Sequence, residues 1–117
     1  MRFSVHPEPS LLRVEMSGLP TPGEVHAMFV AMVKEKAAPP RALIELQVDQ
    51  CLSLLDTMTV MSAVPSLGFP ADYRLALLIT DERMRESAEF AETVAVNRGI
   101  AVRVFDQREA ALTWLAS

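Results

Sequence analysis

The sequence has few of the residues that build covalent or metal-dependent sites. Its 117 residues include one cysteine, two histidines and four glycines. A single cysteine cannot form an intrachain disulfide, and an unpaired thiol is typical of a reducing compartment. The cysteine and histidines show no metal-binding spacing, and the glycines do not cluster as a phosphate-binding loop requires. We therefore expect a cytoplasmic protein with no metal and no cofactor.

Long apolar runs and runs of one charge are also absent. No stretch approaches the ~18 apolar residues that cross a bilayer, and residues 1–8 do not resemble a signal peptide. The 11 basic and 15 acidic side chains give a net charge of −4, with no basic cluster for nucleic acid. The sequence predicts a soluble, unexported protein that has no integral membrane segment and does not bind nucleic acid.

Hydrophobic residues make up 50% of the chain and charged residues 22%, which is typical of a folded core. The length suits one domain over residues 1–117. Hydrophobic periodicity, capping motifs and prolines predict the following order: two short strands or one interrupted strand within 3–16, a helix from Thr21 to before Pro39, a strand at 41–48, a helix from Ser53 to before Pro65, a strand at 75–79, a helix from Asp81 to Gly99, a strand at 100–104 and a helix from Asp106.

The run 75–79 is apolar at every position, as a strand is when helices cover both of its faces, so we expect it to be the central strand. Strands and helices alternate from residue 41 onward, which favours parallel pairing. The predicted fold class is therefore α/β: a single-layer mixed, mostly parallel sheet of four or five strands, flanked by about four helices.

The second predicted helix has too few polar residues for a face in water. Spacing places Leu54, Met58 and Met61 on its core stripe. The remaining face is the one that we expect to contact a partner, and it contains Leu55, Asp56, Thr59, Val60 and Ala63.

Catalytic chemistry has one candidate, Cys51, which lies between a strand and a helix as nucleophiles often do. It would need His6 or His26 as a base. Because free cysteines are commonly buried and structural, we assign no catalytic residue.

The start of the same helix is the other candidate site. Helix starts offer free amides and a positive dipole end, and ligands gather at the carboxyl ends of parallel strands. Ser53 is placed to be a phosphorylated hydroxyl there, or simply to cap the helix.

The end of the chain resembles a known family. The strand Val102–Asp106, the helix sequence Glu109-Ala110-x-x-x-Trp114-Leu115, and residues 75–81 together resemble the SpoIIAA-like family, which is related to STAS (anti-sigma-factor antagonist) domains. The resemblance implies a mixed sheet flanked by helices, a fold shared with the CRAL-TRIO lipid-binding domain. It also implies a phosphorylated serine in an Asp-Ser-Ser-Gly motif. Here that region reads Asp56-Thr57-Met58-Thr59, so Thr57 matches by alignment, whereas Ser53 matches by its distance from the strand.

These features favour a non-enzymatic regulatory or protein-interaction module. A protein partner or a second copy of the chain would bind the second predicted helix. The alternative is a small carrier or sensor of a lipid or other hydrophobic ligand, since seven methionines suit an adaptable apolar pocket. An enzyme built on Cys51 ranks third.

Overall fold

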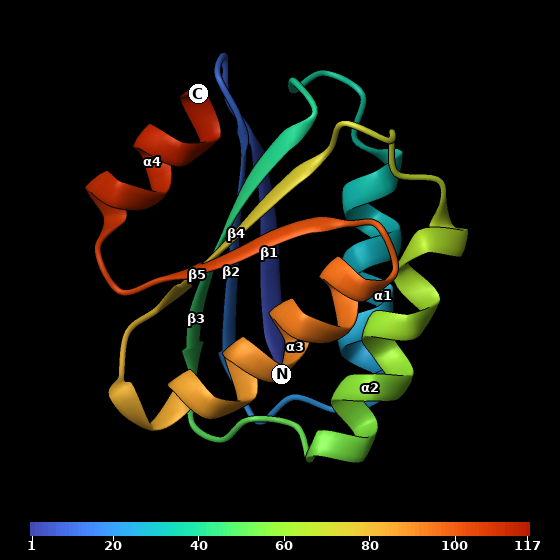
Figure 1. Ribbon diagram of the computed structural model, residues 1–117, viewed down its shortest axis with the longest axis vertical. Coiled ribbons are helices and arrows are strands. Elements are labelled where there is room, and N and C mark those ends of the chain that lie inside the picture. The colour runs from blue at the N-terminus through green and yellow to red at the C-terminus, as the bar shows by residue number, and fades with distance from the viewer.

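A five-stranded β-sheet runs through the middle of the protein, with helices on both faces, in the computed structural model of residues 1–117 (Figure 1). In chain order the elements are β1 (Arg2–Pro7), β2 (Leu12–Gly18), α1 (Pro22–Lys34), β3 (Arg41–Val48), α2 (Leu54–Ala63), the 3-10 turn η1 (Val64–Leu67), β4 (Arg74–Ile79), the 3-10 turn η2 (Glu82–Met84), α3 (Arg85–Asn97), β5 (Ala101–Phe105) and α4 (Arg108–Ala116). The predicted α/β class is confirmed, and the N-terminal region forms two strands.

The strands are arranged in the sheet in the order of the chain, β1-β2-β3-β4-β5. β1 is antiparallel to β2, and all other neighbours are parallel. Crossovers between successive parallel strands are right-handed, which brings α1, α2 and α3 to one face, while α4 lies on the other (Figure 1). Because the strands follow the chain order, the central strand is β3. The prediction that residues 75–79 form the central strand is wrong. β4 is buried on both faces because α4 packs beside it, not because of its rank in the sheet.

The sheet separates two cores of unequal size. The larger contains 23 buried residues between the sheet and α1, α2 and α3. The smaller contains six, under α4: Leu11, Leu43, Ala76, Leu78, Ala111 and Leu115.

Two helices begin with the capping interactions that the sequence predicts. At α1, the Thr21 hydroxyl accepts from the Glu24 N–H at 3.3 Å and donates to the Glu24 carboxylate at 2.8 Å. The hydrogen bond from Thr21 lowers the pKa of Glu24. At α2, the Ser53 Oγ accepts from the Asp56 N–H at 3.1 Å. None of the helices has the length and apolar sequence that a bilayer crossing requires.

α2 turns a different side to the sheet than its spacing predicts. Its sheet-facing positions hold Thr57, Val60 and Met61, which are buried, followed by Val64 at its end. Leu54 and Met58, expected in the core, are 45% and 44% exposed. Apolar residues surround this helix, so spacing alone defines more than one stripe. The stripe at i, i+3, i+4 and i+7 from Thr57 is the one that packs.

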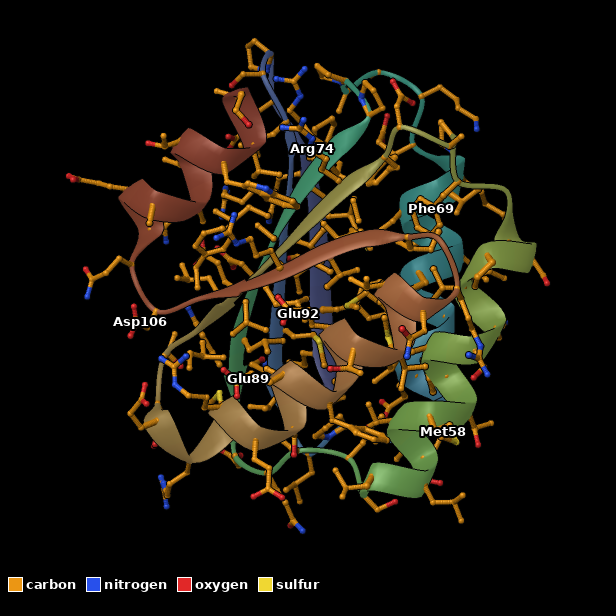
Figure 2. All side chains as sticks on the ribbon, viewed as in Figure 1. Met58, Phe69, Arg74, Glu89, Glu92 and Asp106 are labelled. Atoms are coloured by element: carbon orange, nitrogen blue, oxygen red, sulfur yellow. The ribbon has the colours of Figure 1, made fainter.

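The outer edge of β5 is partly closed by a side chain from α3. The Glu92 carboxylate accepts from the Val104 N–H at 3.0 Å, in the space between α3 and β5 (Figure 2). Occupied edge amides are less available to a further strand.

Candidate functional site

The carboxyl ends of β2, β3 and β4 meet at one edge of the sheet, at the bottom of Figure 1. The loops that begin α1, α2 and α3 all leave from this edge. The first two loops are tied together where the Gly18 carbonyl accepts from the Asp49 N–H at 2.9 Å. Gly18 has a φ of 84°, a conformation that a side chain would strain. This edge is where parallel α/β sheets place their ligands.

Two surface hollows lie at this edge, and Cys51 lines both. One, of about 370 Å³, lies between the loops before α1 and α2 and includes Thr21, Ser53 and Asp56. The other, of about 210 Å³, includes Asp81 and Arg83. The Cys51 thiol is free and half-buried.

The two histidines do not join Cys51. His6 is exposed on β1, where its Nε2 lies 2.9 Å from the Ser4 Oγ. Its row of the sheet passes through Leu43, five residues before the end of β3, which is roughly 16 Å along the strand. His26 is exposed on α1 and lines neither hollow. Nowhere do three histidine, cysteine or carboxylate side chains gather as metal ligands.

The two candidate phosphoacceptors differ in accessibility. Ser53 is exposed, and its hydroxyl caps α2 at the rim of the larger hollow. Thr57 is only 6% exposed and belongs to the buried stripe of α2, so the prediction that it is an accessible phosphoacceptor does not fit its position. The positive end of the α2 dipole already has a negative side chain in the first turn, Asp56.

The arginines near this edge are paired with carboxylates. Asp81 accepts from the Arg83 backbone N–H at 2.9 Å and lies 2.7 Å from the Arg83 guanidinium. The Arg83 hydrogen bonds lower the pKa of Asp81 to about 2. Arg85 bridges Glu82 at 2.7 Å and Asp106 at 2.8 Å, which links the start of α3 to the loop after β5 (Figure 2 marks Asp106). These arginines are therefore engaged by carboxylates.

An apolar cavity of about 90 Å³ lies behind the edge, between the sheet and the helices. Of its 17 lining residues 14 are hydrophobic, and none is charged. Thr57 and Ser87 are its hydroxyl-bearing residues, and Pro20, Cys51 and Leu52 line both the cavity and the larger surface hollow.

The solvent side of α2 carries three large apolar side chains, Leu54, Leu55 and Met58, beside the exposed Thr59. We call these four residues the α2 outer face. Leu55 is 74% exposed, and Figure 2 marks Met58 on this helix. Leu19, 60% exposed, lines the hollow at the start of the same helix.

The predicted partner face overlaps this surface only in part. Leu55 and Thr59 lie on it, and Asp56 and Ala63 are half-buried. Val60 is 4% exposed and packs in the large core, so its assignment to a contact face is wrong. Leu54 and Met58 were missed, although the stripe from Thr57 to Val64 would have left both on the outside.

Comparisons with known proteins do not supply a family. No protein-family model matches the sequence, and no curated protein matches it.

Proposed function

We propose that the protein is a non-enzymatic regulatory module that binds a protein partner through the α2 outer face. The observation that carries the proposal is the clustering of exposed apolar side chains. Three of the seven exposed large hydrophobic side chains in the molecule, Leu54, Leu55 and Met58, fall within five consecutive residues of α2. Single exposed leucines are ordinary on protein surfaces, but a cluster at one place marks a contact site.

Covering the α2 outer face would contribute favourable free energy to binding. Fully burying one leucine or methionine contributes roughly 1.5–3 kcal/mol. Three side chains that are between 44% and 74% exposed on one helix therefore offer several kcal/mol to a partner that covers them. A helix presenting neighbouring anchors is a recurrent form of protein recognition.

Ser53 is the proposed control point of this surface. It immediately precedes Leu54, and its hydroxyl is exposed. A phosphate there would add about two negative charges beside the apolar contact and beside Asp56, which opposes association by desolvation and by repulsion.

The proposal includes membership in the SpoIIAA-like group related to STAS domains, which is supported by the closing strand and helix at residues 102–115. It assigns no reaction to the chain. The unpaired thiol of Cys51 supports a cytoplasmic location.

Photo-crosslinking in cells tests the proposed surface. Benzoylphenylalanine replaces Leu55 in one variant and Leu112 in another, because Leu112 is an exposed leucine on α4, away from α2. We expect Leu55→benzoylphenylalanine to trap one discrete protein adduct, and the Leu112 variant not to trap it. Adding Met58→Asp removes the adduct if the outer face makes the contact.

Sedimentation of the purified chain distinguishes binding of a foreign protein from association with a second copy of the chain. An adduct of twice the chain mass, with a dimer in sedimentation, identifies self-association. Equal labelling from both positions, or no adduct at Leu55, contradicts the proposal.

The lipid-carrier alternative is not favoured by the cavity volume. Ligand pockets generally measure about 300–1,000 Å³. The interior cavity of about 90 Å³ is smaller than an acyl chain requires.

A further inference from the structure

The apolar cavity has a feature that packing does not explain: Thr57, a buried residue that lines it, has a hydroxyl with no protein partner. Thr59 and Thr93 lie in helices and donate to the carbonyls four residues earlier, at 3.1 Å and 3.0 Å. The Thr57 hydroxyl makes no such bond, although the residue is only 6% exposed. Every fully enclosed polar side-chain atom in the molecule has a partner. The Thr57 hydroxyl therefore faces open space, and the space that Thr57 lines is the cavity.

An apolar residue would be expected at this position. Val60, Met61 and Val64 complete the same buried stripe, and valine has almost the shape of threonine. A hydroxyl that faces an apolar space without a protein partner is unfavourable there, whereas one that meets a ligand gains a hydrogen bond and selectivity.

We propose that this cavity is a binding site for a small uncharged molecule that has a compact apolar body and one hydrogen-bonding group, with Thr57 as the residue that recognises that group. The site is independent of the proposed protein contact. Its largely apolar lining, with no charged side chain, excludes an ionic ligand.

The volume sets the size of the ligand. A cavity of ~150 Å³ holds benzene, with six heavy atoms. The cavity of about 90 Å³ therefore suits about four heavy atoms, the size of a three-carbon alcohol or ketone. A ligand this small binds no more tightly than about 40 µM, because each heavy atom contributes only a limited affinity.

The structure also provides a route of entry. Pro20, Cys51 and Leu52 line both the cavity and the hollow of about 370 Å³ at the sheet edge. The hollow and the cavity thus adjoin at these three residues. Methionines on other walls of the cavity can adapt to its shape.

Methionine methyl NMR reports on the site with internal controls. Met16, Met28 and Met61 line the cavity, whereas the other four of the seven methionines do not. The protein, labelled at the methionine methyl groups, is titrated with 2-propanol and separately with xenon, which matches the cavity but cannot form a hydrogen bond. We expect saturable shifts at the three lining methionines with both probes, and none at Met32 or Met84.

Three variants connect binding to the cavity and to the hydroxyl. Thr57→Val should weaken 2-propanol binding about 2–10-fold, the effect of one neutral hydrogen bond, and leave xenon unchanged. Thr57→Ser should retain the preference for the alcohol. Ala91→Leu should fill the cavity and abolish binding of both probes. No saturable shift with 2-propanol, uniform shifts of all seven methyl groups, or equal effects of Thr57→Val on both probes would overturn the proposal.

Discussion

The two faces of the sheet are covered to different extents, and the difference explains the residue pattern of each strand. On the side of α1, α2 and α3, β2 presents Leu12, Val14 and Met16, all buried. Its opposite side presents Arg13 and Glu15, which pair with each other beyond the reach of α4. β4 lies between helices on both faces and is apolar from Leu75 to Ile79. A strand's pattern therefore reports how many of its faces are covered, and not its rank in the sheet.

The faces also differ in how their helices are held. The three-helix face relies on a large apolar core. α4 has a small core and is fixed by directional contacts at its two ends. Arg108 lies 2.6 Å from the Glu45 carboxylate, whose side chain is only 7% exposed. At the other end, Arg74 donates to the Trp114 carbonyl at 2.8 Å and to the Ser117 carbonyl at 2.7 Å (Figure 2 marks Arg74).

Alanine substitutions in β4 compare the two cores within one strand. Leu75 belongs to the large core and is completely buried, whereas Leu78 is 6% exposed and faces α4. We expect Leu75→Ala to lower the free energy of unfolding by about 4 kcal/mol and Leu78→Ala by about 2.5 kcal/mol, because a small core under one helix can relax around the cavity. Urea denaturation measures both. An equal or larger loss for Leu78→Ala would contradict the comparison.

High pH acts on the three-helix face through Tyr73. Its ring packs on Phe69 at 4.8 Å between centroids, and burial raises its pKa to about 12. In the unfolded chain tyrosine ionises near pH 10, so between about pH 10 and 12 the unfolded state releases its proton first and the free energy of unfolding falls, by roughly 2–3 kcal/mol. Tyr73 is the only tyrosine, so absorbance at high pH reports its titration directly. Tyr73→Phe should remove this part of the pH dependence, and a titration near pH 10 in the folded protein would contradict the expectation.

The ion pair under α4 should show an asymmetric double-mutant cycle. Arg108→Met leaves the Glu45 carboxylate buried and unpaired, and should cost about 1–2 kcal/mol of unfolding free energy, less than a fully buried pair because Arg108 is half exposed. Glu45→Met should cost less, since Arg108 can turn to water. Glu45→Met combined with Arg108→Met should recover most of the loss. Equal costs for the two single variants would show that burial of Glu45 is not what matters.

Local signals in the sequence predicted the elements of the fold. Thr21 and Ser53 predicted the starts of α1 and α2, because a capping motif lies within four consecutive residues. Pro39 set the limit of the first helix, which ends before it at Lys34. The rank of β4 in the sheet could not be predicted in the same way. Its apolar run indicates that helices cover both of its faces, and α4 provides this cover for a strand that is not the central one.

The candidate site was predicted less well than the fold. Ser53 was singled out from its position, and it does lie exposed at the carboxyl edge, whereas its role and that of α2 as a contact helix stay predictions. The exposed face of α2 was misassigned because apolar residues surround the helix. The methionines suggested an apolar pocket, but the place and size of the cavity could not be predicted. Both depend on how side chains from the sheet and several helices meet, which no local pattern encodes.

The two sides of α2 also differ in how far they are covered: Val60 is buried and Leu55 is exposed. Substitutions on the two sides should therefore differ in their effect on stability. Leu55→Asp should change the free energy of unfolding by less than about 0.5 kcal/mol, because Leu55 is 74% exposed and an acidic residue suits the first turn of a helix. The control, Val60→Ala on the buried side, should cost about 2 kcal/mol. If Leu55→Asp proved as destabilising as Val60→Ala, Leu55 would be packed within the molecule, and the α2 outer face would not be available to a partner.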